Sequence, residues 1–460
     1  MLKLTTKQLA TILQAELVGE ANVVVENIST DTRQRVASSL FFALKGEHFD
    51  AHNYLDKAVA QGANALVVER ADTQISVPQL IVKDTRIALG ELAKWVKQQV
   101  NPRTLAMTGS SGKTTVKEMT ASILQSAVGV EQVLFTQGNF NNDIGVPLTL
   151  LRLTEQHQFA VIELGANHQG EIAYTTGLVQ PNVALVNNVA AAHLEGFGSL
   201  EGVATAKGEI YRGLQPDGVA IINKEHDYRS TWAQDIAAHR VQYFAYQDNT
   251  ADFYADNVIF HEAGSTFDLC TPQGKTTIHL PYLGEHNVKN ALAASALAMN
   301  VGATLAQIKQ GLEVRTQVKG RLYPVQPCDN LLLLDDTYNA NVDSLQSAIR
   351  VLQKYDAFRI LVVGDMAELG ENSQICHQQV AECAKAAKLE RVYSFGSESA
   401  VISQACLGKH FTDKALLCRE LTQLLSEKLK ENQKIVLLAK GSRRMQMEDV
   451  INTLRENFVC

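Results

Sequence analysis

One short run of residues in this chain has the types and spacing to do chemistry: Gly109, Ser110, Ser111, Gly112, Lys113, Thr114 and Thr115. The apolar stretch before it predicts a strand, and the pattern after it predicts a helix, so the run is a candidate phosphate-binding loop. In such a loop, backbone N–H groups and the positive end of the helix dipole face an anion. Lys113 would then reach the outer phosphates of a nucleotide, and the Thr114 hydroxyl would bind the accompanying Mg²⁺.

The glycine spacing departs from the widespread form of this motif. The pattern G-x-x-x-x-G-K-[ST] requires a glycine where this chain has Met107. The first glycine is Gly109, which gives the shorter form G-x-x-G-K-T. A glycine-rich turn without a ligand would not need the lysine and threonine. We interpret the shorter spacing as typical of a particular subclass of nucleotide loop.

Polar residues elsewhere are expected to gather around this loop. Ligands of open α/β sheets bind beyond the carboxyl ends of the strands, and Glu163 ends a predicted strand. His193 follows another strand, Lys207 lies on a helix predicted over 200–214, and Asn287 stands at a predicted helix start. Taken singly, each fits a plainer role: a solvated carboxylate, a structural histidine, a solvated lysine and a helix cap. Together with the loop, they indicate a nucleotide site.

The elements that position these residues divide into three units. A prior of about 150 residues per domain favours three domains in a chain of 460 residues. Residues 1–84 form a small α/β unit, and 85–313 alternate strands and helices as a parallel, doubly wound sheet. Residues 314–460 repeat that pattern without a phosphate loop. We therefore predict an α/β protein with a small N-terminal domain, a central P-loop NTPase-like domain and a C-terminal Rossmann-like domain.

Three local predictions can be compared directly with the structure. The first helix has Thr5 or Thr6 as its cap and extends its apolar face to Leu17. The strand-like runs after Tyr246 predict a small antiparallel insertion. A helix rich in alanine is predicted over 287–300.

Composition excludes several classes of protein. The formal charge of −7 argues against general binding to nucleic acid or to anionic membranes, since both favour a basic surface. No apolar run approaches the roughly 18 residues of a membrane span, and the N-terminal residues lack the apolar core of a signal peptide. The seven cysteines include no C-x-x-C pair, which favours free thiols over a zinc site. We expect a cytoplasmic protein.

Two polar clusters interrupt the strands of the first unit. One contains Ser29, Asp31 and Arg33, and the other contains Lys45 and His48. Arg33 and Lys45 are suited to pair with phosphate oxygens. The plainer interpretation is ordinary loop polarity, and the residues alone do not decide between the two.

The residues taken together resemble the Mur ligases and their folylpolyglutamate synthase relatives, which are ATP-dependent amide-forming enzymes. The resemblance covers essentially the whole chain. Its motifs are residues 108–115, Glu163-Leu164-Gly165, His193, Lys207, His286-Asn287-Val288-Lys289-Asn290, Gly320-Arg321 and Asp336.

Within that family, four stretches are similar to the member that adds D-alanyl-D-alanine to UDP-N-acetylmuramoyl-tripeptide: residues 136–148, 163–167, 336–341 and 364–370. The Asp-Asn-Pro-Arg segment of the diaminopimelate-adding relative is absent. Two positions depart from the usual pattern: Ala51 stands where relatives often carry glycine, and Val342 where they often carry proline. The first weakens the transfer of uridine-nucleotide contacts to that loop.

The resemblance implies roles at the nucleotide site. ATP and Mg²⁺ are the implied cofactors, with the loop and Lys113 on the phosphates and with Thr114 and Glu163 on one Mg²⁺. His193 and a carbamylated Lys207 would hold a second Mg²⁺. Asn287 would read adenine, while Arg321 and Asp336 would contact phosphate and ribose.

The resemblance also implies where the substrates lie. The first unit would hold the uridine diphosphate end through Ser29, Asp31, Arg33, Lys45 and His48. Asn139 and Asn142 are further candidates for substrate contact, and Tyr338, Asn339 and Asn341 are candidates for the dipeptide end. The third domain would close over the site, and the short loops favour a monomer whose partners are small molecules.

Two other functions are compatible with the same residues. One is a different amide ligase of the family, acting on a shorter peptide or on folate. The other is an ATP-driven switch protein, in which turnover moves domains and forms no amide.

Overall fold

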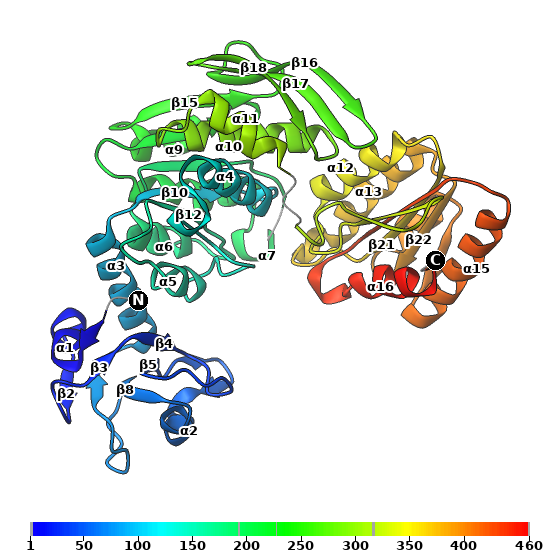
Figure 1. Cartoon of the computed structure of the whole chain (residues 1–460). Helices are drawn as coiled ribbons and strands as arrows, with labels where there is room; N and C mark the ends of the chain where they lie inside the picture. Colours follow the sequence, from blue (N-terminus) through cyan, green and yellow to red (C-terminus); the bar gives the residue numbers. More distant parts are fainter. Residues whose placement is uncertain (1–2, 192–193, 227, 315–317, 459–460) are drawn as a thin grey trace.

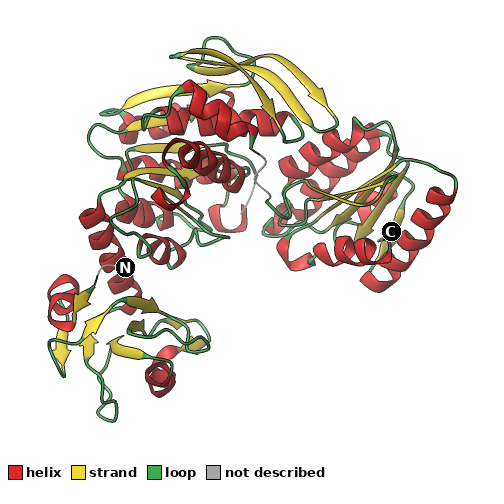
Figure 2. Ribbon diagram, viewed as in Figure 1, coloured by secondary structure: helices red, strands yellow, loops and turns green. Residues whose placement is uncertain are grey.

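Three β-sheets organise the chain, one in each predicted unit (Figures 1 and 2). The computed structural model describes residues 3–191, 194–226, 228–314 and 318–458. The prediction of an α/β protein built from three such units is confirmed. The boundaries proposed above, 84/85 and 313/314, fall between the sheets.

The first sheet has five strands in the order β2-β9-β8-β5-β4. Helix α1 begins after Thr5, whose side chain accepts from the Gln8 N–H in a capping box, as predicted. It ends earlier than the prediction, because Gln14 adopts the left-handed conformation and Leu17 belongs to β2. The elements are β1 (Leu4–Thr5), α1 (Thr6–Leu13), β2 (Glu16–Val18), β3 (Val24–Val25), β4 (Asn27–Ser29), β5 (Ser39–Phe42), β6 (Lys45–Gly46), β7 (Phe49–Asp50), α2 (Leu55–Ala60), β8 (Ala63–Val68) and β9 (Gln79–Ile81).

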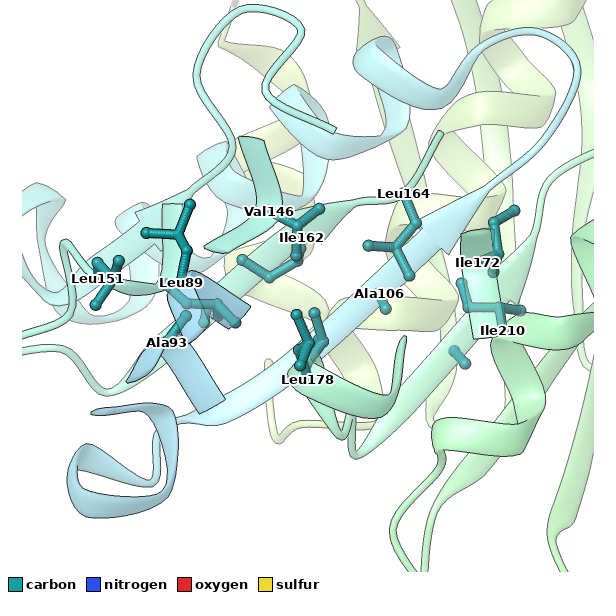
Figure 3. Packing of buried hydrophobic residues seen from close by; sticks show 14 of the residues in the cluster. Leu89, Ala93, Ala106, Val146, Leu151, Ile162, Leu164, Ile172, Leu178 and Ile210 are labelled. Carbon is teal, nitrogen blue, oxygen red and sulfur yellow. The ribbon is translucent and has the colours of Figure 1, made fainter. Parts of the chain in front are cut away.

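Helix α3 (Thr85–Val100) links the first unit to the second. Asp84 caps its first turn through bonds from the backbone N–H groups of Arg86 and Ile87. The helix touches α1 on one side and α5 (Gly145–Leu150) and α6 (Glu171–Val179) on the other. Its apolar side chains join one continuous core across both units. Figure 3 shows Leu89 and Ala93 of this helix together with core residues of the central unit.

The central sheet has nine strands in the order β11-β12-β10-β13-β14-β15-β16-β17-β18. All pairs up to β16 are parallel, and the last two are antiparallel. The predicted antiparallel strands are confirmed, and they extend the main sheet through the pairing of β15 with β16. The strands are β10 (Arg103–Thr108), β11 (Val133–Phe135), β12 (Phe159–Glu163), β13 (Val183–Val186), β14 (Val219–Asn223), β15 (Arg240–Ala245), β16 (Phe253–His261), β17 (Gly264–Thr271) and β18 (Gly274–Leu280).

Helices cover both faces of this sheet, which explains why its central strands β12 and β13 carry apolar residues at successive positions. In β10, Leu105 and Met107 pack with α4 (Lys113–Val128), α10 (Glu285–Met299) and α11 (Leu305–Glu313). Ala106 points to the opposite face and packs in the core that α3 shares (Figure 3). The remaining helices are α7 (Leu194–Phe197), α8 (Leu200–Gly208) and α9 (Arg229–Ile236).

The helix predicted over 200–214 is shorter than expected. α8 ends at Gly208, where a Cβ atom would lie 2.1 Å from Cδ1 of Trp232. The chain then tightens into a 3₁₀ turn, Glu209–Gly213. There the Glu209 carboxylate accepts bonds from the N–H groups of Gly170 and Ala173 at the start of α6.

Strand β18 is an outer edge of the central sheet, and two side chains of α11 form hydrogen bonds with its backbone. Lys309 Nζ donates to the Thr277 carbonyl at 2.6 Å. The Glu313 carboxylate accepts from the His279 N–H at 3.0 Å.

The third sheet has six strands in the order β19-β20-β24-β21-β22-β23, all parallel except the outer strand β19. Apolar clusters fill both faces. Its elements are β19 (Tyr323–Cys328), β20 (Leu331–Asp335), α12 (Val342–Gln353), β21 (Phe358–Gly364), α13 (Ser373–Ala387), β22 (Arg391–Phe395), α14 (Ala400–Ala405), β23 (Lys409–Phe411), α15 (Lys414–Lys430), β24 (Ile435–Lys440) and α16 (Glu448–Asn457).

The third unit also contacts the second through α7 and through the β16–β17 hairpin. The Glu195 N–H, in α7, donates to the Glu368 carbonyl at 3.4 Å. Lys354 Nζ lies 3.9 Å from the centre of the Phe260 ring, near the tip of the β16–β17 hairpin. Within the described ranges, no helix combines the length and apolarity needed to cross a bilayer.

Candidate active site

The phosphate loop joins β10 to α4, as the sequence predicts. Gly112 stands just before the helix with φ 76°, and a Cβ atom there would lie 2.5 Å from Asn290 Oδ1. Both the backbone conformation and the close approach of α10 therefore require glycine. The Ser110 hydroxyl donates to the Ala190 carbonyl at 3.0 Å, so the loop is fastened to the chain that follows β13.

Asparagine side chains connect this loop to α10. Asn188 Oδ1 accepts from the Ser111 N–H at 2.9 Å, and Asn187 Nδ2 donates to the Ser111 carbonyl and to Asn290 Oδ1, each at 3.1 Å. Asn290 Nδ2 then donates to Asn287 Oδ1 at 3.0 Å. The phosphate loop and the predicted adenine-reading residue thus belong to one hydrogen-bonded unit.

Lys113 lies over the loop, with Nζ donating to the Gly109 carbonyl at 2.7 Å. Desolvation lowers its pKa, an effect that the Glu163 carboxylate opposes and Arg321 reinforces. The charge of the lysine is therefore influenced by one negative and one positive side chain. A bound phosphate would add negative charge and favour the charged form of the lysine.

Glu163 ends β12 and is 2% exposed. Its Oε1 accepts from Asn141 Nδ2 at 2.8 Å, and its N–H donates to the Thr136 hydroxyl at 3.0 Å. Oε2 is buried and has no hydrogen-bond partner in the described part of the chain. A buried carboxylate oxygen without a partner is costly, and a hard cation such as Mg²⁺ would supply the missing partner.

Lys207 lies at the end of α8 and is 2% exposed. Burial moves its pKa well below the ordinary lysine value, and repulsion from Lys113 adds to that shift. Its Nζ is 5.7 Å from the centre of the Phe197 ring. His193, the other predicted ligand of the second metal, lies outside the described residues.

Two adjoining cavities, of about 110 Å³ and about 220 Å³, open between the central and C-terminal units. Ser111, Gly112 and Arg321 line both of them. The smaller cavity is also lined by Asn287 and Asp336. The larger one brings together most of the residues predicted for phosphate transfer and the dipeptide: Lys113, Glu163, Asn139, Asn142, Tyr338, Asn339 and Asn341.

The C-terminal unit supplies a cation–carboxylate arrangement to these cavities. The Arg321 guanidinium lies 4.3 Å from the centre of the Tyr338 ring. Lys440 Nζ forms an ion pair with Asp336 at 2.8 Å and donates to the Asn339 carbonyl at 2.8 Å. Burial lowers the pKa of Lys440, and Asp336 counteracts that effect. The Asn341 side chain caps α12, so it has a structural task besides lining the cavity.

The predicted residues of the first unit are not among those that line either cavity. Arg33 bonds the Asp31 carboxylate and lowers its pKa to about 2, while Lys45 pairs with Glu69. Arg33, Lys45 and His48 are exposed. The structure thus separates a buried cleft from an exposed set of charges.

Several residues of the cleft were not singled out by their sequence pattern. They are Asn141, Asn187, Asn188, Asn290 and Lys440. Asn141 and Asn290 lie in stretches that the family resemblance had marked without giving each residue a role. The signal for Lys440 is a lysine at the carboxyl end of a wholly apolar strand, β24, where burial requires a charged partner.

Comparison with known proteins matches three family models to the chain. Residues 107–298 match the Mur ligase middle domain, 320–443 the Mur ligase glutamate ligase domain, and 24–97 the Mur ligase family catalytic domain. The last match includes most of α3, which the boundary proposed at 84/85 assigns to the central unit.

Named relatives cover the whole chain. The UDP-N-acetylmuramoyl-tripeptide–D-alanyl-D-alanine ligase of Haemophilus influenzae is 66% identical, and that of Escherichia coli is 53% identical, each over 100% of both chains. Among solved structures, MurF from Acinetobacter baumannii superposes with a TM-score of 0.92 at 38% identity, over 99% of both chains. MurF ligase from Thermotoga maritima in complex with ADP gives 0.83 at 26% identity, over 94% of this chain and 98% of that one.

Proposed function

Because the chain belongs to the Mur ligase family, we propose that it joins D-alanyl-D-alanine to UDP-N-acetylmuramoyl-tripeptide with the conversion of ATP to ADP and phosphate, in peptidoglycan precursor synthesis. The 66% identity to a ligase of that name over the full length of both chains carries this assignment. The cleft agrees with it, since a phosphate loop, a buried carboxylate and polar residues of the C-terminal unit line adjoining cavities.

The first step activates the tripeptide. Its terminal carboxylate oxygen attacks the γ-phosphorus of ATP, and the bond from that phosphorus to the bridging oxygen breaks. ADP departs, and the tripeptide carries the phosphate as an acyl phosphate. This transfer depends mainly on positioning and charge neutralisation. Lys113 and the backbone N–H groups of the loop hold the β- and γ-phosphates, while Arg321 approaches from the opposite domain.

The second step forms the amide. The amine nitrogen of D-alanyl-D-alanine attacks the acyl carbon, the C–O bond to phosphate breaks, and the amine proton goes to solvent or to a neighbouring base. Tyr338, Asn339 and Asn341 would hold the dipeptide, and they line the larger cavity together with Asn139 and Asn142. Closure of the C-terminal unit would exclude water that hydrolyses the acyl phosphate.

Mg²⁺ fits the residues of this cleft. The unpartnered buried Oε2 of Glu163 is a hard oxygen ligand, and the Thr114 hydroxyl, in the first turn of α4, is the second ligand that we propose. When bound, Mg²⁺ would neutralise negative charge on the transferring phosphate. The described residues contain no preformed group of three or more His, Cys, Asp or Glu side chains for a metal, so phosphate oxygens would complete its coordination.

We assign Lys207 to a second Mg²⁺, together with His193, after carbamylation. Burial lowers the pKa of its ammonium group and so favours the neutral amine, whose nitrogen attacks CO₂ with loss of a proton. The product is a carboxylate-like oxygen ligand, whereas an ammonium would repel the metal.

The remaining assignments concern the ends of the substrates and the state of the enzyme. The clusters Ser29, Asp31 and Arg33, and Lys45 and His48, would hold the uridine diphosphate. Asn287 and Asp336 would contact adenine and ribose. The three domains would span 1–84, 85–313 and 314–460. We propose a cytoplasmic monomer, on the composition of the chain and its short connecting loops.

One assay tests the function: phosphate release with ATP, Mg²⁺, the UDP-linked tripeptide and D-alanyl-D-alanine, each omitted in turn. The ligase requires all four for sustained release. Equal release without the dipeptide would contradict amide formation and favour an ATP-driven switch. Release that requires a different amine or carboxylate would favour another ligase of the family.

A further inference from the structure

Asn141 is the side chain that touches the Glu163 carboxylate. It lies in the loop between β11 and α5, and its Nδ2 donates to Glu163 Oε1 at 2.8 Å. Because an ionised carboxylate only accepts hydrogen bonds, the amide nitrogen and not the amide oxygen must face it. Neither the loop motif nor the strand-end position of Glu163 identifies this partner.

The backbone holds Asn141 against the end of β12. Its N–H donates to the Asn139 carbonyl at 2.7 Å, and its carbonyl accepts from the Gly165 N–H at 2.8 Å. A Cβ atom on Gly165 would lie 2.9 Å from Asn141 Cγ. The absence of a side chain at Gly165 therefore leaves room for the amide. The two backbone hydrogen bonds of Asn141 hold that amide beside Glu163.

The two oxygens of Glu163 consequently differ. Oε1 has a fixed donor, whereas Oε2 is buried without one in the described part of the chain. A half-turn of the carboxylate would exchange the roles of the two oxygens, because Oε2 would then accept from the amide and Oε1 would lose its donor. In either orientation, one oxygen is held by Asn141 and the other is left for a cation.

We infer that Asn141 is a positioning residue for metal binding: it fixes the plane of the Glu163 carboxylate and leaves one buried oxygen to bind Mg²⁺. This inference rests on the metal role proposed for Glu163. Outer partners that orient a metal ligand typically contribute about 10- to 100-fold in metal affinity. Asn141 is expected to act within that range, through Glu163 and without touching the nucleotide.

Binding measurements on the full chain test this role. Mn²⁺, which is detected by electron paramagnetic resonance, serves as the metal probe in the presence of ADP. We expect Asn141→Ala to weaken Mn²⁺ binding about tenfold and to leave ADP binding in EDTA unchanged. In the steady state, the Mg²⁺ concentration for half-maximal rate should rise while KM for D-alanyl-D-alanine stays the same. Gln137→Ala, at an exposed position of the same loop, is the matched control.

Glu163→Gln separates failure of the inference from failure of the proposed function. If Glu163→Gln binds Mn²⁺ as the unchanged protein does, the metal role of Glu163 is wrong. If Glu163→Gln loses Mn²⁺ while Asn141→Ala retains full affinity, the positioning role alone is overturned. Loss of ADP binding in EDTA by Asn141→Ala would also overturn it, because Asn141 would then support the whole loop.

Discussion

The cleft and the N-terminal clusters both contain charged residues suited to phosphate, but they present them differently. Glu163 of the cleft and Lys207 at the end of α8 are each 2% exposed, and Glu163 Oε2 has no described partner. In the N-terminal unit, Arg33 is exposed and already bonded to Asp31. Buried charges are strong and fixed, whereas exposed pairs are screened by water and exchange partners easily. The cleft is therefore suited to transition-state stabilisation, and the clusters to holding one end of a substrate.

The largest expected effect comes from removing the loop lysine. Lys113→Ala should lower kcat about 10³-fold, because electrostatic contacts to a transferring phosphoryl group act mainly in the transition state. Steady-state kinetics with all substrates saturating measure this. A loss confined to KM for ATP would show that the cleft binds ground state and transition state equally, and would weaken the contrast.

Lys207→Ala should give the next largest effect, a loss of ligase activity of about 10²-fold, because the site would lose a metal ligand. Added short carboxylates should restore part of the activity, since they supply the oxygen that the carbamate provides. Lys207→Arg, which has a cationic side chain that cannot form that carbamate, is the companion variant, and its activity should not exceed that of the alanine variant. Full activity in Lys207→Ala would reject the metal role.

Arg33→Ala should have a smaller effect of a different kind. We expect KM for the UDP-linked tripeptide to rise about tenfold, as for the loss of one charged hydrogen bond, with kcat and KM for ATP unchanged. The effect should shrink as ionic strength rises, because exposed charges are screened. Arg35→Ala, also exposed, is a control of the same charge nearby. An unchanged KM would return the cluster to ordinary loop polarity.

The smallest effect concerns pH. Desolvation, with repulsion from Lys440, lowers the pKa of His286 to about 4 from an ordinary value of 6.5. Since the unfolded chain binds the proton first, His286 contributes full stability above pH 6.5 and loses it as the pH falls toward 4. Thermal unfolding at pH 6.5 and at pH 4 should show a smaller fall in Tm between the two for His286→Gln than for the unchanged protein. The exposed His261→Gln should leave the drop unchanged.

The sequence predicted the parts of the molecule that follow from local pattern. Glu163 ends strand β12, and the loop at Gly112 joins strand to helix, both as predicted. Family resemblance supplied the amide ligase function, which the full-length relatives confirm. The residue roles within the cleft, ATP contacts included, stay predictions, while ADP in the Thermotoga maritima structure supports nucleotide use in this family.

Long-range packing decided what the sequence could not predict. Trp232 packs against Gly208, the last residue of α8. Its position in the sequence lies outside 200–214, so the pattern of that segment could not predict the contact. The antiparallel strands join the central sheet because β16 pairs with β15, a choice of neighbour that strand propensity does not encode. Asn141 and Lys440 matter through partners distant in sequence, Glu163 and Asp336.

The edge of the central sheet at β18 has a further consequence, for colloidal behaviour. A sheet that ends in an antiparallel hairpin offers backbone groups on which strands of other molecules can assemble. Lys309 and Glu313 of α11 occupy a carbonyl and an N–H of that edge with their own charged ends. The same helix that packs on the core thus blocks the edge against intermolecular pairing, so the long sheet can serve the nucleotide cleft without becoming a template for aggregation.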